Sequence, residues 1–176
     1  MITLPPNTTI RFLNSDDAPS YQQLRLESLQ NSANAFLSLY KNEVLLNTRT
    51  FSQHLQYSLQ PPYFGYYGLF VDDKLVGYVQ VCSVSFEKKQ HLAEIYNVYI
   101  TPAQRRRGLA KLLFEYVFDK LKENPETEQI YLSCTASNKS ALNFYKQLGF
   151  RRFAVKRQAI KWQGQYDDEI EMVKML

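Results

Sequence analysis

One turn, between an apolar strand and an amphipathic helix, constrains this sequence more than any other segment. Residues 93–100 read Ala-Glu-Ile-Tyr-Asn-Val-Tyr-Ile, which predicts a strand that ends at Thr101-Pro102. Apolar residues then recur at helical spacing from Leu109 to Leu121. Between the two lies Gln-Arg-Arg-Arg-Gly-Leu-Ala, residues 104–110. Because a helix N-terminus presents unpaired N–H groups and a positive dipole end, this unit predicts a phosphate-binding loop.

The residue types in the turn suit a polyanionic ligand. Gly108 has no Cβ, so a phosphate oxygen can approach the backbone there, and Ala110 is nearly as small. Arg105, Arg106 and Arg107 add positive charge. The chain has no Gly-x-x-x-x-Gly-Lys-Ser/Thr and no Gly-x-Gly-x-x-Gly, so the two common alternative phosphate motifs are excluded.

A second segment, residues 132–150, predicts a strand followed by a capped helix. It reads Leu-Ser-Cys-Thr-Ala-Ser-Asn-Lys-Ser-Ala-Leu-Asn-Phe-Tyr-Lys-Gln-Leu-Gly-Phe. Ser137 or Asn138 stands where a helix N-cap is expected, and Gly149 stands where the helix ends. The interval between this segment and the turn is long enough for one helix and one strand.

Together the two segments resemble the signatures of the GNAT N-acetyltransferase superfamily. Arg105, Gly108 and Ala110 fall on the three defined positions of Gln/Arg-x-x-Gly-x-Gly/Ala. The second segment matches Asn-x-x-Ala-x-x-Phe-Tyr-x-x-x-Gly-Phe at Asn138, Ala141, Phe144, Tyr145, Gly149 and Phe150. The resemblance is close over residues 91–153 and diffuse outside them. It implies a turn that holds the pyrophosphate of acetyl-CoA, with acetyl-CoA (coenzyme A) as the cosubstrate and no metal.

The resemblance also implies a GNAT fold. This is a mixed α/β (α+β) architecture with a mostly antiparallel, splayed seven-stranded sheet and about four flanking helices. Sequence patterns give the element order β-α-α-β-β-β-α-β-α-β-β over one domain, residues 1–176. Helices are predicted from the capping residues 14–17 to about 31, over 39–58 with a break near 47, over 106–122, and from 138 to 148. In the family, the sheet splays between its fourth and fifth strands to admit the cofactor.

Composition agrees with a cytoplasmic enzyme domain. The chain has 176 residues, of which 45% are apolar, so it can bury a core and is not expected to be disordered. It has no run of eighteen apolar residues and no charged-then-apolar leader, which predicts no membrane partner and no signal peptide. The net charge is +4, but most basic residues are scattered, so no nucleic-acid partner is expected. Cys82 and Cys134 are expected to be reduced thiols, and two distant histidines offer no metal site.

Acetyl transfer to an amine needs a base, a donor for the developing negative charge and an acid for the leaving thiolate. In the resembled family the amine attacks directly. Tyr145 is the candidate acid, because its motif position commonly hydrogen-bonds the sulfur of coenzyme A in the family; the alternative is a core tyrosine. Glu94 is the candidate base, because some histone-type members carry a glutamate fourteen residues before the same glycine. The alternative is a surface glutamate paired with Lys88 or Lys89.

Further site residues follow from the strand pattern and the resemblance. Period-two alternation puts Glu94, Tyr96, Val98 and Ile100 on one face of the strand, with Ile95, Asn97 and Tyr99 on the other. The candidate cofactor-binding residues are Val98, Ile100, Arg105, Arg106, Arg107, Gly108, Leu109, Ala110, Asn138 and Tyr145. Phe36, Tyr96 and Asn97 are candidates for contacting the acceptor, and acidic residues such as Glu27 and Glu43 could attract a cation.

These features predict an acyltransferase, an acetyl-CoA-dependent N-acetyltransferase that acts on a primary amine. A small-molecule amine is favoured, because the sequence shows no extra recognition domain and has a short loop before the strand at residues 91–100. A protein or peptide N-terminal acetyltransferase and a non-catalytic CoA-binding regulatory module stay open as alternatives. The oligomeric state is also open, a homodimer included.

Overall fold

A computed structural model describes residues 5–176, and a seven-stranded sheet in the order β1-β2-β3-β4-β5-β7-β6 runs through it. The strands are β1 (Thr8–Phe12), β2 (Gly65–Val71), β3 (Lys74–Ser83), β4 (Leu92–Ile100), β5 (Gln129–Thr135), β6 (Arg151–Trp162) and β7 (Gln165–Met175). The helices are α1 (Ala18–Asn31), α2 (Tyr40–Glu43), α3 (Thr48–Ser58), α4 (Leu109–Lys122) and α5 (Lys139–Gln147). Short 3₁₀ turns are η1 (Ser15–Asp17), η2 (Ala33–Ala35), η3 (Glu87–Lys89) and η4 (Pro102–Gln104).

This architecture confirms the predicted fold class and the order of the elements. The break expected near residue 47 is real, because Asn47 accepts the Thr50 N–H and starts α3 as a separate helix. The described part of the chain therefore has five α-helices where about four were predicted. None of these helices is both long and apolar enough to cross a membrane.

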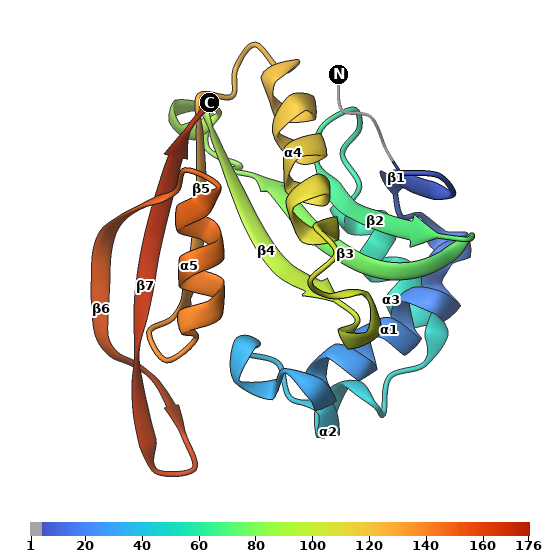
Figure 1. The fold of residues 1–176 in the computed structure, drawn as a ribbon, viewed down its shortest axis with the longest axis horizontal. Helices are drawn as coiled ribbons and strands as arrows, with labels where there is room; N and C mark the ends of the chain where they lie inside the picture. Colours follow the sequence, from blue (N-terminus) through green and yellow to red (C-terminus); the bar gives the residue numbers. More distant parts are fainter. Residues whose placement is uncertain (1–4) are drawn as a thin grey trace.

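Helices cover both faces of the sheet (Figure 1). On one face, α4 buries Leu113, Phe114 and Val117 against strand residues such as Val79 and Ile95. On the other face, side chains of α1 and α3 pack against a group of strand tyrosines; this cluster includes Tyr21, Leu24, Phe51, Leu55, Tyr66, Tyr78 and Tyr99. The sheet thus separates two cores, one under α4 and α5 and one under α1 and α3.

An ion pair on the edge strand fixes the start of α1. Arg11 donates two hydrogen bonds to the Asp17 carboxylate, at 2.7 and 2.8 Å, and its guanidinium lies 4.3 Å from the centroid of the Phe70 ring. Asp17 also accepts the Asn14 N–H at 3.0 Å, completing a capping box. The Arg11 hydrogen bonds hold the pKa of Asp17 below its ordinary value. Because β1 is at the edge of the sheet, this pair lies three strands away from β4.

The sheet opens between β4 and β5, as predicted. These two strands are parallel and pair only where Leu92–Ile95 faces Gln129–Leu132. Beyond Ile95 the two strands diverge (Figure 1), while β5 stays paired with β7 along its other edge as far as Thr135. The opening therefore starts in the middle of β4 and widens toward the segment that leads into α4.

A bulge in β4 makes the predicted alternation of its side chains wrong. Gln80 of β3 faces Tyr96, but Tyr78 faces Tyr99, so two residues of β4 lie opposite one of β3. Asn97 sits at this bulge with a left-handed backbone, φ 48°. An extra residue shifts the period-two pattern by one position. The side chains that face α4 and α5 are therefore Ala93, Ile95, Val98 and Ile100, and those that face α1 are Glu94, Tyr96, Asn97 and Tyr99.

Candidate active site

The predicted phosphate loop lies at the end of β4 and leads into α4. Arg106 and Gly108 both have left-handed backbones, with φ 61° and 77°, and Gly108 is the N-cap of α4. A Cβ placed on Gly108 would meet no atom within 4 Å, so the space beside this backbone is open. A hollow of about 210 Å³ adjoins it, lined in part by Arg107, Leu109 and Lys111. An open helix N-terminus with nearby cations is a suitable site for a phosphate group.

The Arg105 side chain has a different position from the one expected for a phosphate ligand. Its Nε donates to the Ile100 carbonyl at 2.8 Å, and its Nη2 donates to Ser32 Oγ at 3.3 Å. Its guanidinium also lies 5.3 Å from the centroid of the Tyr99 ring. The Arg105 side chain thus ties the loop to the ends of β4 and α1. All three arginines are exposed, and Arg107 Nη1 donates to Gln104 Oε1 within the loop.

Tyr145 faces the opening from the α4 and α5 side of the sheet. It is buried against Phe114 and Phe150, with ring centroids 5.8 and 6.1 Å away. Cys134 lies on β5 beyond the last residue that pairs with β4, and, after burial, its thiol adds a small contribution to the raised pKa of Tyr145. Burial raises the pKa of Tyr145, so its hydroxyl stays protonated at neutral pH and can act as a donor.

Glu94 and Tyr96 form a pair on the opposite face of the sheet. The Tyr96 hydroxyl donates to Glu94 Oε2 at 2.6 Å, and the Tyr96 side chain is 45% exposed. Burial and the Glu94 carboxylate raise the pKa of Tyr96 and bring that of the neighbouring Cys82 thiol to about 11. Among residues 5–176, the ion pairs of the structure do not include Glu94, so the expected alternative of a pair with Lys88 or Lys89 is not seen.

Tyr145 and Glu94 therefore lie on opposite faces of the sheet, and Glu94 lies one residue before the point where β4 and β5 separate. Val98 and Ile100, which were predicted to align the cofactor, face the Tyr145 side, while the predicted acceptor residues Tyr96 and Asn97 face the Glu94 side. A group bound under α4 and a group bound under α1 can meet only through the gap between β4 and β5. The gap between β4 and β5 therefore connects the two faces of the sheet.

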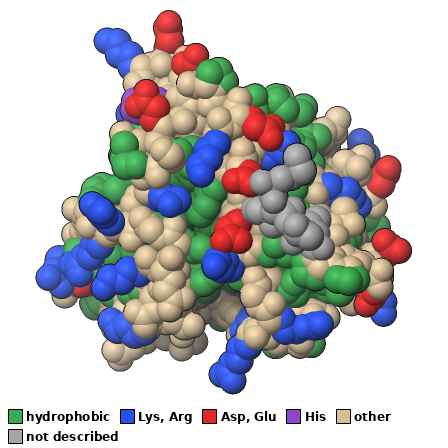
Figure 2. Space-filling view, turned by 45° about the horizontal axis from the view of Figure 1, so that its top comes forward, with side chains coloured by type: hydrophobic (Ala, Val, Ile, Leu, Met, Phe, Trp, Pro, Cys, Tyr) green, Lys and Arg blue, Asp and Glu red, His purple; other side chains and the backbone are tan. Residues whose placement is uncertain are grey.

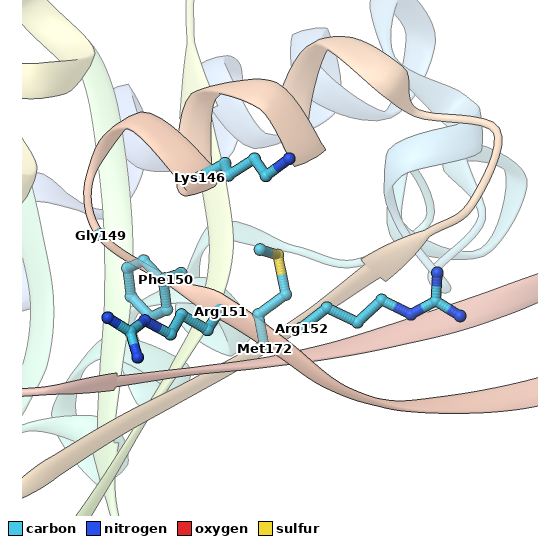
Figure 3. A pocket seen from close by; sticks show the side chains of 6 residues that line it. All are labelled: Lys146, Gly149, Phe150, Arg151, Arg152 and Met172. Carbon is cyan, nitrogen blue, oxygen red and sulfur yellow. The ribbon is translucent and has the colours of Figure 1, made fainter.

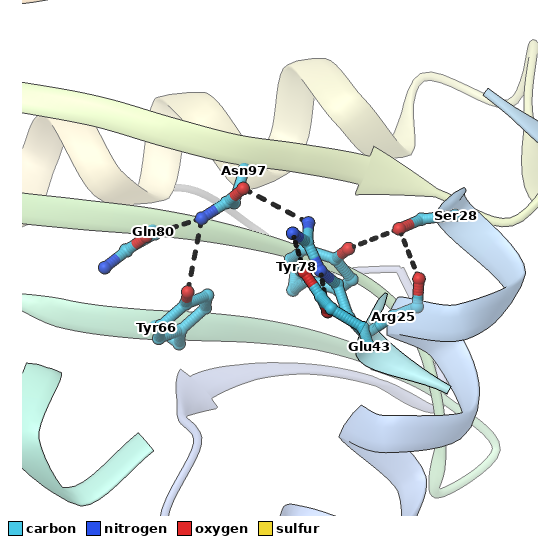
Figure 4. Close-up of polar contacts among 7 residues, drawn as sticks. All are labelled: Arg25, Ser28, Glu43, Tyr66, Tyr78, Gln80 and Asn97. Atoms are coloured by element: carbon cyan, nitrogen blue, oxygen red, sulfur yellow. Dashed lines mark hydrogen bonds and ion pairs between the residues drawn. The ribbon is translucent and has the colours of Figure 1, made fainter. Parts of the chain in front are cut away.

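A buried polar network lies on the α1 side of this gap (Figure 4). Arg25 of α1 donates to both carboxylate oxygens of Glu43, at 2.9 and 2.7 Å, and to Asn97 Oδ1 at 3.2 Å. Its guanidinium lies 5.0 Å from the centroid of Phe36, the third predicted acceptor residue. Burial alone would raise the pKa of Glu43, but the Arg25 hydrogen bonds and charge outweigh it and lower that pKa.

Sequence reasoning did not identify Arg25. A signal was present, since the buried positions Tyr21, Leu24, Arg25 and Ser28 follow helical spacing and place a charged residue on the inward face of α1. Two of the acids expected to attract a cation, Glu27 and Glu43, are engaged by other side chains. Glu43 pairs with Arg25, and Glu27 accepts hydrogen bonds from the Tyr99 and Thr101 hydroxyls at 2.9 and 2.7 Å.

A second, larger hollow lies away from this site. It measures about 420 Å³ and is lined by Lys146 of α5 and by Arg151, Arg152 and Met172 of β6 and β7 (Figure 3). It lies at the C-terminal end of α5, whereas the opening lies at the N-terminal end of that helix. Basic side chains also gather on the side of the molecule where β6 and α5 lie (Figure 2). The scattered distribution expected from the sequence therefore does not hold for β6.

Comparison with known proteins identifies the family. The model of the Acetyltransferase (GNAT) family matches residues 26–150. The chain belongs to this family. The [Ribosomal protein bS18]-alanine N-acetyltransferase of Salmonella typhimurium is 31% identical over 80 residues, which are 46% of this chain and 53% of that protein. An N-alpha-acetyltransferase of Saccharolobus solfataricus is 25% identical over 124 residues, 64% of this chain and 74% of that one. The match to the first of these spans about half of its length.

Solved structures show the same fold. A ribosomal-protein-alanine N-acetyltransferase from Brucella melitensis superposes with a TM-score of 0.80 at 20% identity, covering 96% of this chain and 99% of that one. The structure of yncA from Salmonella typhimurium, solved with its cofactor acetyl-CoA, gives a TM-score of 0.79 at 19% identity, covering 97% and 94%. At these identities the likeness concerns the fold alone.

GNAT acetyltransferases use acetyl-CoA, and the residues present fit that molecule. The open backbone at Gly108 and the positive end of α4 suit its pyrophosphate. Asn138 caps α5 by accepting the Ala141 N–H at 3.1 Å, so its predicted contact to the cofactor would be additional to this role. The Thr135 hydroxyl, at the free end of β5, is buried without a hydrogen-bond partner among residues 5–176. A polar ligand in the opening would satisfy it.

We expect Gly108→Val to abolish most of the stabilisation that acetyl-CoA gives the folded chain. A ligand that binds only the native state adds about 2.7 kcal/mol at a hundredfold excess over Kd. Valine would fill the open space beside the loop and disfavour the positive φ. Thermal melts with and without acetyl-CoA measure the effect.

Gly164→Val is the matched control. Gly164 also has a positive φ, 81°, and no neighbour within 4 Å of a Cβ, but it lies in the turn between β6 and β7. This variant should lose stability and keep the full shift with acetyl-CoA. Equal loss of the shift in both variants would assign the effect to backbone strain, and a wild type that shows no shift at millimolar acetyl-CoA would contradict the site.

Proposed function

We propose that this chain is an acetyl-CoA-dependent N-acetyltransferase whose acceptor is the α-amino group of a peptide or protein. The observation that carries the activity is the placement of Tyr145 and Glu94 on opposite faces of the sheet, at an opening beside a phosphate loop. The acetyl donor enters on the α4 and α5 side and the amine enters on the α1 side.

The roles of the residues follow from this division. The Glu94 carboxylate, oriented by the Tyr96 hydroxyl, accepts a proton from the amine directly or through a water molecule. Tyr145 donates a hydrogen bond to the departing sulfur, a role that suits its protonated hydroxyl. Backbone groups at the β4 bulge, which the ladder with β3 leaves free, are candidate donors to the developing negative charge.

The surface around the acceptor side favours a peptide. Leu37, Val44 and Leu45, between α1 and α3, are exposed, with Leu37 and Leu45 about 80% exposed. Isolated exposed side chains are common, but these three lie in one segment, which follows the η2 turn that contacts β5. Such a group is expected for a surface that contacts a chain rather than a single amine. The relatives named above act on ribosomal-protein alanine and on N-alpha amines, which agrees with this acceptor class.

A small-molecule amine is the second candidate. The connection between β3 and β4, residues 84–91, is short and holds only the η3 turn, so it adds no further element for recognising a protein substrate. We also propose that residues 1–176 form one domain, because both core clusters share one sheet. The expected cytoplasmic location, the lack of a nucleic-acid partner and an open oligomeric state stay predictions.

A panel of acceptors separates the two candidates. We expect peptides with a free N-terminus to release coenzyme A thiol with kcat/KM at least about tenfold above small amines, because more of their surface is contacted. The same peptides with a blocked N-terminus are the control and should give no thiol release. A preference for polyamines or amino acids would select the small-molecule candidate, and acetyl-CoA binding without transfer to any amine would support a non-catalytic module.

We expect Tyr145→Phe to lower kcat by about 10²–10⁴-fold, the usual contribution of a general acid. The ring and its contacts with Phe114 and Phe150 stay, so stability should change little. Tyr67→Phe is the matched control, because Tyr67 is equally buried but donates to the Tyr63 carbonyl, away from the opening. A kcat unchanged at saturating acetyl-CoA would make Tyr145 a core tyrosine.

We expect Glu94→Gln to lower kcat/KM for the amine most at neutral pH, with partial recovery as pH rises. An α-amine has a pKa of about 7.7–8.0 and a lysine-like amine about 10.4, so a peptide acceptor should recover near pH 8–9. Glu171→Gln is the control, since Glu171 lies on β7 and pairs with Lys156. A variant rate that runs parallel to wild type at every pH would show that Glu94 positions the acceptor and is not the base.

A further inference from the structure

Arg25 brings a charge into the buried side of α1, and every nitrogen of its guanidinium is engaged. Its side chain is 6% exposed. Nε and Nη2 contact the two oxygens of Glu43, and Nη1 contacts Asn97 Oδ1. Burying a charge is costly unless it is paired and hydrogen-bonded, so this geometry is strongly specified.

The side-chain amide nitrogen of Asn97 is also hydrogen-bonded. Its Nδ2 donates to Gln80 Oε1 at 2.7 Å and to the Tyr66 hydroxyl at 3.2 Å. With the Arg25 contact, the Asn97 amide is therefore bonded to α1, β2 and β3 (Figure 4). Asparagine tolerates the left-handed backbone that the bulge requires, and the network keeps it in that conformation.

The bulge lies beside the reacting groups. Asn97 directly follows Tyr96, whose hydroxyl donates a hydrogen bond to Glu94. Both residues lie beyond Ile95, the last residue of β4 that pairs with β5. A shift of Asn97 would move Tyr96 and the free backbone groups of the bulge together. A displacement of about 1 Å can cost an enzyme about a hundredfold in rate.

We propose that Arg25 is a positioning residue for acetyl transfer: anchored by Glu43, it fixes the Asn97 side chain and so the shape of the β4 bulge beside Glu94. Its effect on rate rests on the proposed function. A role confined to holding α2 onto α1 is the alternative, and both roles require the Arg25–Glu43 pair for stability.

Arg25→Lys tests the link without removing the buried charge. Lysine presents one compact ammonium and cannot serve both Glu43 oxygens and Asn97 in a planar arrangement. We expect kcat to fall by about tenfold to a hundredfold, while KM for acetyl-CoA stays within about twofold. Arg11→Lys is the matched control, because Arg11 makes the same two-point contact with Asp17 and lies over an aromatic ring, but on β1. It should lose stability and keep kcat.

A double variant shows whether Arg25 acts through Asn97. Asn97→Gly removes the side chain and accepts the φ of 48° without strain. If Arg25 acts through Asn97, adding Arg25→Lys to Asn97→Gly lowers kcat no further. Losses that multiply would show that the two residues act independently and would overturn the proposal.

Amide hydrogen exchange provides a readout that does not depend on activity. In Arg25→Lys, exchange over residues 96–99 should accelerate more than in Arg11→Lys, relative to each variant's stability. Unchanged exchange at the bulge overturns the proposal even where kcat falls. If the wild type transfers acetyl to no amine but exchange accelerates as expected, the proposed function has failed and the link between Arg25 and the bulge stands.

Discussion

The interruption of β4 on both of its edges is the constraint on which the rest of the structure depends. Toward β5, its pairing stops at Ile95, and toward β3 its register breaks at Asn97. Each interruption removes ladder hydrogen bonds from the middle of a sheet, and buried backbone groups left unpaired are costly. On the α1 side, the hydrogen bonds of the Asn97 side chain with Arg25, Tyr66 and Gln80 stabilise the edge of β4 that faces β3. The other edge stays available to a ligand that can supply the missing partners.

This constraint also explains why the two faces of the sheet differ chemically. The face under α4 and α5 is apolar around Ile95 and Val98, and its polar group near the opening is the Tyr145 hydroxyl, which burial keeps protonated. The face under α1 carries carboxylates, an arginine and several hydroxyls. A neutral donor is suited to a leaving thiolate, and a charged face with a half-buried carboxylate is suited to an ammonium that must lose a proton. One extra residue in β4 places Glu94 and Asn97 together on that second face.

Sequence reasoning reached the parts of the site whose determinants are local. The phosphate loop and the α5 helix were predicted because their glycines, caps and helical spacing are written in short segments, at Gly108 and at Asn138 to Gly149. The face assignment along β4 failed, because alternation assumes regular pairing and the bulge depends on register with β3. Arg25 was missed because its partner Asn97 is 72 residues away, and the side chain of Arg105 was assigned to the ligand although it bonds to Ile100 and Ser32.

Two arginines connect the acceptor side to the rest of the site. The segment from Ser32 to Glu43 runs from the end of α1 through α2, and its η2 turn lies near β5. Arg105, from the phosphate loop, holds Ser32 at the start of this segment, and Arg25 holds Phe36 and Glu43 further along it. The contacts to Ser32 and Glu43 are hydrogen bonds from a guanidinium, which fix direction as well as distance, and the Phe36 ring packs against the Arg25 guanidinium. The proposed acceptor entrance is therefore shaped by residues that also fix the proposed phosphate loop and the β4 bulge, so the two halves of the site cannot be arranged independently.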